Sequence, residues 1–466
     1  MDKKGGRDKR RIIGRSGFTL MEIIIALSLL GMVMAAAGGF IKFSFTAEKK
    51  VEDEYELQSE MRHATEILNN AVRDASVTFI MPGDAEEAYL KDKWSYIGVS
   101  EDKREFVQYL WVPNEDGKGG SHVKRVLVSA KNGVTYSLRF DNTEDTKLVD
   151  YTIGLDKVNG KSMEVASTVS AINSVAVDLY SSERNPASLI AYREDPRPQP
   201  EGNKNVTVVI SMVLDDSGSM KDAMGGGSPG RNEKSRSQIM KDKANALIDS
   251  FPENVWLGVV RFADNANNPS SLIHLVDERK KEEAKRKIPT SANGGTNTGD
   301  GLRRGYYQLQ SYSKAADEEV LYYIILLTDG DPTYYSYVSG GSSYDNKRTN
   351  LVYQKAEGNI KNRGGSGSTD RYDTCIDYTK YIGDELLIKD TGLKPKTFVI
   401  GFSGVPSEVS RAKIIAKNCN PAGTNLNEIY FDATDETSLG IAFDAIKETI
   451  LLELWHIYGP YGKPEN

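Results

Sequence analysis

A run of nineteen residues without a charged side chain, from Ile23 to Ile41, lies close to the start of this 466-residue chain and ends at Lys42. About twenty apolar residues are enough for a helix to span the hydrocarbon core of a bilayer. The run therefore predicts one membrane-spanning helix. A carboxylate, Glu22, immediately precedes it, and such a group needs a partner because desolvation of a charge is unfavourable.

The segment before the apolar run is strongly basic, with seven Lys and Arg residues against two acidic residues in positions 1–17. A positive segment of this kind stays on the cytoplasmic side of a membrane. An ordinary signal peptide places its small-residue cleavage site after the apolar run, whereas here the small residue, Gly17, lies before it. Cleavage after Gly17 would leave the apolar helix on the mature chain.

The residues Gly17, Phe18, Thr19, Leu20 and Glu22 resemble the class III signal of type IV prepilins. The resemblance implies cleavage between Gly17 and Phe18 by a prepilin peptidase, followed by N-methylation of Phe18. It also implies that Glu22 of one subunit neutralises the Phe18 amine of a neighbour during assembly. A plain signal anchor with Glu22 at the membrane interface is the alternative.

The pattern after the membrane segment predicts an α+β pilin module. Apolar residues at spacings of three and four, such as Met61, Ala64 and Leu68, extend one helix over residues 18–75. Residues 76–192 contain β-rich runs separated by turn-forming segments, which predicts an antiparallel sheet. A long helix followed by such a sheet is the pilin architecture, and we expect this module to dock the subunit into a filament.

Residues 193–205 contain a proline at every second position from Pro196 to Pro200, which predicts an extended linker. Beyond it, apolar strands alternate with helical segments over residues 206–453, the pattern of a Rossmann-like α/β domain with a parallel sheet. The remaining residues, 454–466, form an aromatic tail.

Three short polar segments of the second domain follow a strand or precede a helix. They contain Asp215-x-Ser217-x-Ser219, Thr296 within a Gly-Gly-Thr-Asn-Thr-Gly sequence, and Asp329. Ligands collect at the carboxyl ends of the strands in an open α/β sheet, so we expect the three segments to meet there. Their hydroxyl and carboxylate oxygens suit Mg²⁺ or Mn²⁺, with Ca²⁺ less favoured, and do not suit zinc.

The same segments resemble the metal-ion-dependent adhesion site of von Willebrand factor A domains. The resemblance maps the five metal-site positions of that family onto Asp215, Ser217, Ser219, Thr296 and Asp329. It implies that the two serines bind the metal directly, and that the other three residues bind it directly or through water. In this family the open metal position often accepts a carboxylate from a protein ligand.

A domain of that type binds and does not catalyse, so we expect no enzyme. An enzyme would need a positioned base, nucleophile or activated water. The one histidine within residues 206–453, His274, lies in an apolar stretch and is expected to pack. The formal net charge of −7 argues against nucleic-acid binding, which normally shows a basic surface.

Two loops border the predicted metal site. Residues 222–235 are Gly-rich, and residues 331–372 contain many tyrosines. The tyrosine-rich loop forms either a binding surface or an insertion without a ligand role. Similar cysteine pairs in some bacterial A-type domains imply a disulfide between Cys375 and Cys419. Their predicted positions, at a helix start and a helix end, argue against it.

Together, these features resemble the modular minor pilins of Gram-positive bacteria such as streptococci, in which an A-type domain follows a short pilin module. We expect a membrane precursor that becomes part of an extracellular type IV pilus, at its surface or tip. Its expected partners are other pilins, the prepilin peptidase, and host or matrix proteins. The alternative role is in assembly, with the A-type domain binding another pilus component to prime the filament or sense force.

Overall fold

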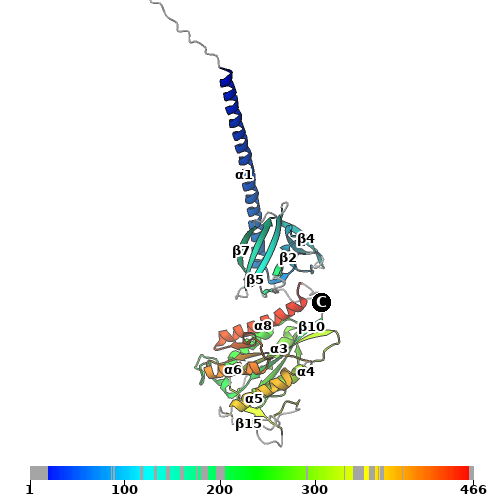
Figure 1. The fold of residues 1–466 in the computed structure, drawn as a ribbon. Helices are drawn as coiled ribbons and strands as arrows, with labels where there is room; N and C mark the ends of the chain where they lie inside the picture. The colour runs from blue at the N-terminus through cyan, green and yellow to red at the C-terminus, as the bar shows by residue number, and fades with distance from the viewer. Residues whose placement is uncertain are drawn as a thin grey trace, which may run out of the picture.

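The computed structural model describes residues 19–85, 87, 90–115, 119–130, 134–142, 147–157, 162–174, 177–179, 187–195, 205–289, 292–329, 331–338, 351–355, 363–365, 367, 372–390 and 392–460. The predicted leader with Gly17, the mature end at Phe18 and the proline-rich part of the linker lie outside the described residues. A long helix, a β-rich module and an α/β module follow one another along the molecule (Figure 1).

The first helix, α1 (Leu20–Asp74), begins with a capping box. The Thr19 hydroxyl accepts a hydrogen bond from the Glu22 N–H, and the Glu22 carboxylate accepts one from the Thr19 N–H at 2.9 Å. Residues Leu20–Glu52 are long and apolar enough to cross a membrane, and this part of the helix projects away from the rest of the protein (Figure 1). Farther along, Met61 and Leu68 are buried, so the end of α1 packs on the sheets of the first module.

The β-rich module contains a six-stranded sheet and a three-stranded sheet. The larger sheet has the strand order β4-β3-β2-β9-β1-β8. Its strands are β1 (Val77–Pro82), β2 (Ser95–Val99), β3 (Glu105–Pro113), β4 (Gly120–Ser129), β8 (Val177–Leu179) and β9 (Ala187–Arg193). The smaller sheet is formed by β5 (Val134–Asn142), β6 (Leu148–Lys157) and β7 (Ser162–Ser170).

All strand pairs of this module are antiparallel except β1 and β8, which pair in parallel at the sheet edge. The predicted antiparallel sheet is thus confirmed, with one parallel pair at its edge. α1 contacts β4 and β7, so it lies against both sheets. The helix side chains Met61 and Leu68 share a core with Tyr136 and Tyr151 of the small sheet. Packing, and not helix propensity, therefore holds this end of α1 in place.

The second module is built on a six-stranded sheet with the order β12-β11-β10-β13-β16-β17. Its strands are β10 (Asn205–Asp215), β11 (Val255–Phe262), β12 (Ile273–His274), β13 (Glu318–Thr328), β16 (Lys396–Gly401) and β17 (Tyr430–Asp432). The pairs are parallel, except that the short edge strand β12 runs antiparallel to β11. β10 has neighbours on both sides and is buried from Val206 to Asp215, as its apolar sequence predicts.

Helices cover both faces of this sheet, as expected for a Rossmann-like domain. One face packs against α2 (Arg236–Ser250), α3 (Glu278–Lys285) and α8 (Glu436–Tyr458). The other packs against α4 (Thr298–Gln310), α5 (Tyr372–Ile382) and α6 (Pro406–Asn418). A small pair of strands, β14 (Tyr334–Ser336) and β15 (Arg363–Gly365), and the short helix α7 (Leu426–Ile429) complete the described elements.

The two cysteines form no disulfide in this structure, which agrees with the argument from their predicted positions at a helix start and a helix end, and not with the pairing that the resemblance implied. Cys375 lies in α5 and Cys419 caps the end of α6, and both are buried in the same apolar cluster. Burial raises the pKa of the Cys419 thiol well above its ordinary value, so this thiol stays protonated. The cysteines therefore serve as small apolar core side chains.

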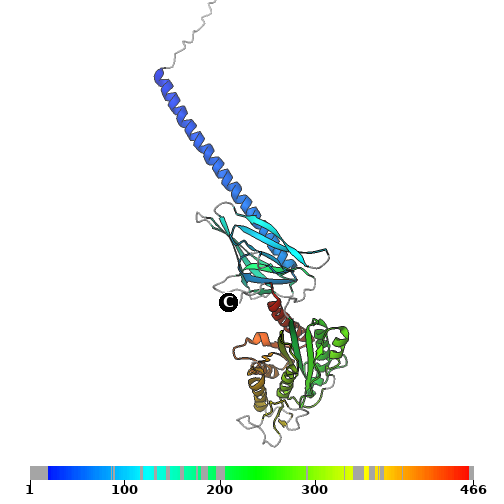
Figure 2. The same ribbon diagram turned by 90° about the vertical axis from the view of Figure 1, so that its right-hand side faces the viewer.

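The two modules meet at the end of α8, which continues to Tyr458 and past the predicted domain end at residue 453. Trp455 is 1% exposed and joins the core on the outer face of the large β-sheet. Its ring lies 5.7 Å from the Trp94 ring, and the Arg193 guanidinium lies 5.6 Å from it. Figure 2 shows α8 reaching the β-rich module. The first residues of the predicted tail are thus an interdomain anchor.

Candidate functional site

The first polar segment follows the central strand directly. β10 ends at Asp215, and a 3-10 turn (Gly218–Lys221) begins after Ser217. The Ser217 N–H donates to Asp215 Oδ1 at 2.9 Å, and the Ser217 and Ser219 hydroxyls lie 3.1 Å apart. The Thr328 hydroxyl, at the end of the neighbouring strand β13, donates to Asp215 Oδ2 at 3.0 Å. The Asp215 carboxylate is therefore oriented by the turn that follows β10 and by the end of β13.

Backbone hydrogen bonds bring the second segment to the first. The Gly218 N–H donates to Gly294 O at 2.9 Å. Thr296 is fixed in turn by its N–H, which donates to the Thr333 hydroxyl, and by its carbonyl, which accepts from the Thr333 N–H, both at 2.8 Å. Gly294 has a φ of 85°, a conformation that favours glycine. The Gly-Gly-Thr sequence therefore allows the close approach of these loops.

The third segment begins at Asp329, directly after β13, and its side chain is 3% exposed. Arg236 Nη1 donates a hydrogen bond to its carboxylate at 3.0 Å, and the nearby Ser219 hydroxyl favours its ionised form and lowers its pKa. The structure thus brings Asp215, Ser217, Ser219 and Asp329 together, and it places Thr296 on the adjoining loop. Arg236 is a member of this site that the sequence motif does not include.

Two carboxylates, those of Asp215 and Asp329, are buried together in this site. Burial raises the pKa of Asp215, and the neighbouring charge of Asp329 raises it further. Burial also raises the pKa of Asp329, while the Ser219 hydroxyl and the Arg236 guanidinium oppose that rise. A cation bound between the two carboxylates would favour their ionised forms.

The side chains at the junction of the loops fit a hard divalent cation. Asp215, Ser217, Thr296 and Asp329 are at most 4% exposed, whereas Ser219 is exposed and marks the side open to solvent. The set offers carboxylate and hydroxyl oxygens, which are ligands for Mg²⁺ or Mn²⁺. Among the described residues there is no cluster of three or more His, Cys, Asp or Glu side chains, as expected for a site in which three of five donors are hydroxyls.

Four aspartates in and around these loops each pair with an arginine. The pairs are Asp216 with Arg261 at 4.0 Å, Asp264 with Arg363 at 2.7 Å, Asp329 with Arg236 at 3.0 Å, and Asp331 with Arg411. Every pair joins residues that are distant in the sequence. No local pattern could have identified them, because the pairing depends on which loops the sheet brings together.

The described part of the tyrosine-rich loop is ordered against the site. β14 and β15 pair with each other, and the Arg363 guanidinium lies 4.8 Å from the centre of the Tyr334 ring. A methyl group added to Gly295 would lie 2.5 Å from that ring. Tyr334 therefore covers the loop that carries Thr296. The tyrosines at 344 and 372 lie outside the residues or side chains that are described.

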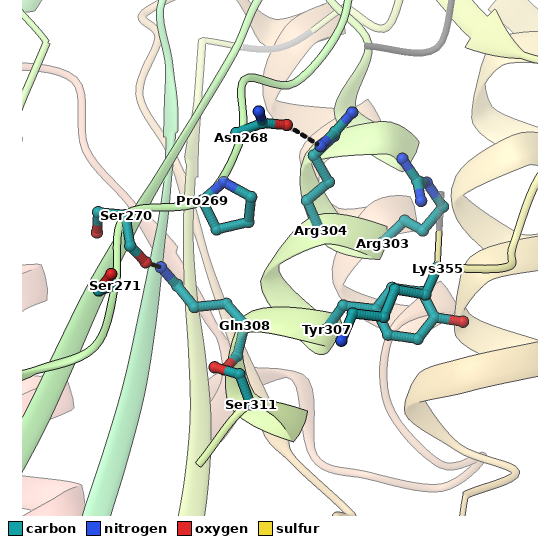
Figure 3. A pocket seen from close by; sticks show the side chains of 10 residues that line it. All are labelled: Asn268, Pro269, Ser270, Ser271, Arg303, Arg304, Tyr307, Gln308, Ser311 and Lys355. Carbon is teal, nitrogen blue, oxygen red and sulfur yellow. Dashed lines mark hydrogen bonds between the residues drawn. The ribbon is translucent and has the colours of Figure 1, made fainter. Parts of the chain in front are cut away.

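A separate cavity of about 390 Å³ lies on the flank of α4, and none of the five predicted metal-site residues lines it (Figure 3). Its polar side chains largely engage one another. Gln308 pairs with Ser211 Oγ and Ser270 O, and Arg304 donates to Asn268 Oδ1 at 3.0 Å. We therefore assign this cavity a packing role. His274 also packs as expected, because its ring stacks on Trp256 at 4.6 Å.

Comparison with known families finds two matches, one near the start of the chain and one in the α/β module. The family described as "Prokaryotic N-terminal methylation motif" matches residues 14–38. The family described as "von Willebrand factor type A domain" matches residues 210–331, the part that contains all five predicted metal-site residues. A curated relative of the second region, calcium-activated chloride channel regulator 1 from Sus scrofa, is 28% identical over 123 residues, which is 26% of this chain and 12% of that protein.

Among solved structures, the PilB minor pilin from Streptococcus sanguinis is similar over nearly the whole described fold. It is 25% identical, with a TM-score of 0.65, and the match covers 88% of this chain and 100% of that chain. A D-to-A point mutant of the same pilin matches with a TM-score of 0.66 and covers 87% of this chain. The likeness includes the β-rich module as well as the α/β domain.

Proposed function

We propose that this chain, a type IV minor pilin that carries a von Willebrand factor type A domain, is a metal-dependent adhesin for host or matrix proteins. The observation that carries the proposal is the convergence of Asp215, Ser217, Ser219 and Asp329, beside Thr296, at one edge of the sheet. Ser219 is exposed there, so a protein partner can reach the site from solvent.

The precursor is held in the cell membrane and the mature subunit belongs to an extracellular pilus. The methylation motif at residues 14–38 and the apolar helix within Leu20–Glu52 support this placement. Within it, we propose that the prepilin peptidase cuts between Gly17 and Phe18, and that Glu22 pairs with the new amine of a neighbouring subunit. In the isolated chain the Glu22 carboxylate accepts hydrogen bonds from Thr19 instead.

In the proposed binding mechanism the protein supplies a preorganised set of oxygen donors. Asp215 is oriented by the Ser217 N–H and the Thr328 hydroxyl, so its carboxylate needs little reorganisation on binding. The Gly218 to Gly294 hydrogen bond holds the Thr296 loop beside the two serines. Domains of the von Willebrand type commonly bind a divalent metal at such a site, and that metal, when bound, supplies a coordination position for an acidic group of the partner.

A direct test measures metal and partner binding on the full-length protein in detergent. Calorimetric titration with Mn²⁺ and Mg²⁺ should show binding, and immobilised extracellular-matrix proteins should capture the protein only without chelator. Asp215→Ala should abolish both signals, whereas Asp242→Ala, at an exposed position on α2, should retain them. Flat titrations of a folded wild-type protein with both metals would contradict the proposal.

An assembly role is the alternative, in which the A-type domain binds another pilus component. For both the adhesin role and the assembly role, the bulky second module is consistent with a subunit of low abundance in the pilus. Strains with Asp215→Ala separate the two roles. Loss of pili would favour assembly, while normal pili with lost adhesion would favour the adhesin. The structure that this chain resembles over its length is that of a pilin, not of an enzyme.

A further inference from the structure

Arg236, the first residue of α2, reaches into the candidate metal site. Its Nη1 donates to Asp329 Oδ2 at 3.0 Å, and the two side chains are only 4% and 3% exposed. Its Nη2 donates to Met224 O at 3.4 Å, while Nε has no hydrogen-bond partner among the described residues. A guanidinium buried with an unsatisfied nitrogen is unfavourable unless its charge is compensated. Asp329 supplies that compensation.

The presence of Arg236 changes the charge that a cation would meet. Asp215 and Asp329 alone carry a formal charge of −2, and Arg236 reduces it to −1. A guanidinium within hydrogen-bond distance of one of two carboxylate donors weakens the attraction for a further cation, because like charges repel strongly where water is excluded. It also leaves a divalent site with excess positive charge, which favours an acidic partner.

We propose that Arg236 is a resident counter-ion of this site, which stabilises the metal-free state through Asp329 and lowers the affinity for the metal. The inference deepens the proposed function and rests on it. Arg236 thus makes the site bind the cation less tightly, and it favours the binding of an acidic partner group. The neighbouring pairs of Asp216 with Arg261 and of Asp264 with Arg363 support this assignment, because they neutralise two further carboxylates beside the same loops.

The inference predicts two effects of opposite sign for Arg236→Gln. In chelator, the melting temperature of the full-length protein should fall by roughly 5–15 °C, because Asp329 loses its buried partner. The affinity for Mn²⁺, measured by calorimetry on the same protein, should rise at least about tenfold. Arg236→Lys keeps the positive charge and should remain within about threefold of the wild-type affinity.

Arg303→Gln provides a matched control for the loss of stability. Arg303 forms a similarly buried pair with Asp300, at 2.7 Å and with both side chains at most 1% exposed, but it lies on α4 outside the metal loops. This variant should also melt earlier, yet its affinity for Mn²⁺ should stay close to that of the wild type. A tighter affinity that appeared equally in Arg303→Gln would overturn the inference.

A second pair of variants tests the inference if Arg236→Gln alone does not fold. Asp329→Asn leaves the Arg236 charge uncompensated beside Asp215, and its affinity for Mn²⁺ should fall sharply. Adding Arg236→Gln to Asp329→Asn removes that charge and should recover at least about tenfold of the lost affinity. A double variant that binds Mn²⁺ no better than Asp329→Asn alone would overturn the inference.

The results also distinguish this inference from the proposed function. A folded wild-type protein that binds no Mn²⁺ contradicts the proposed function, and a gain of binding in Arg236→Gln would then still support the counter-ion. Wild-type binding that Arg236→Gln leaves unchanged or weakens contradicts the counter-ion alone. A melting temperature of Arg236→Gln in chelator equal to that of the wild type also contradicts the counter-ion role.

Discussion

At the scale of single residues, the candidate site depends on donors that orient a buried carboxylate. Asp215 is fully buried and receives hydrogen bonds from the Ser217 N–H at 2.9 Å and from the Thr328 hydroxyl at 3.0 Å. The motif contains Asp215 and Ser217, whereas Thr328 belongs to the adjacent strand and orients Asp215 through its hydroxyl. Residues that orient a ligand side chain affect metal affinity although they do not touch the metal.

Replacing Thr328 with valine should therefore weaken both stability and metal binding. The change keeps the shape of the side chain and removes one donor from a buried carboxylate, which should cost about 1–3 kcal/mol of unfolding free energy. Urea unfolding in chelator measures this loss, and calorimetry should show a severalfold weaker affinity for Mn²⁺. Thr449→Val removes a hydroxyl that donates within α8 and should leave the Mn²⁺ affinity unchanged.

The cysteines give a second prediction at this scale. Cys375 and Cys419 are each 1% exposed and neither is in a disulfide, so iodoacetamide should label neither rapidly in the folded protein. After denaturation without reductant, mass spectrometry should find two alkylated thiols. Denatured, unreduced protein that takes up no label would instead demonstrate the disulfide that the structure lacks.

At the scale of elements, the packing of α5 on α6 depends on a close approach of backbones. The end of α5 continues into a π-helical turn (Gly383–Leu387). A β-carbon added to Gly383 would lie 1.8 Å from Asn418 O near the end of α6, a separation that forces the helices apart. This contact explains why a glycine is placed within an otherwise helical segment, where its flexibility is unfavourable.

We therefore expect Gly383→Ala to lower the unfolding free energy by about 1–3 kcal/mol or more, since overpacking moves the backbone. Gly440→Ala is the matched control in α8, because its added methyl group would lie 3.7 Å from the nearest atom, Lys243 Nζ. That change should be neutral or add up to about 1 kcal/mol, as alanine favours helices. Equal losses in both variants, measured by urea unfolding, would contradict the proposed role of Gly383.

At the scale of the whole molecule, the end of α8 fixes one module on the other. Trp455 packs edge-on against Trp94, and the Lys91 ammonium and the Tyr96 hydroxyl donate to the carbonyls of Gly459 and Pro460 at 2.8 and 2.9 Å. The chain thus leaves the first module through the linker and returns to it through α8. Two connections instead of one restrict the orientation of the candidate metal site relative to α1.

Trp455→Ala should loosen this arrangement without unfolding either module. Removing the ring opens a cavity in the interdomain core, and small-angle X-ray scattering should show an increased radius of gyration. Ile441→Ala, on the exposed side of the same helix with 65% of the residue accessible, should leave the scattering curve unchanged. The Mn²⁺ affinity should be unaffected by either change, because the metal loops lie on other elements.

Much of the fold could be predicted because it depends on patterns between neighbouring residues. The apolar run from Ile23 predicts the long helix, and the alternation of strands and helices after residue 205 predicts the second module. The sequence patterns do not indicate features in which an element depends on its partner. The parallel pairing of β8, the π-helical turn at Gly383 and the helical start of the predicted tail all require a distant surface to pack against.

The sequence by itself determined the prepilin signal and the two-module order and indicated the residues of the candidate metal site, because each is a pattern with its own physical reason. Only the tertiary structure decided that Arg236 neutralises Asp329, 93 residues away, that Cys375 and Cys419 are separate core residues, and that Trp455 joins the modules. These contacts arise when the sheet brings distant loops and helices together. A linear sequence pattern does not indicate which charged or aromatic side chains, distant in the sequence, will come into contact.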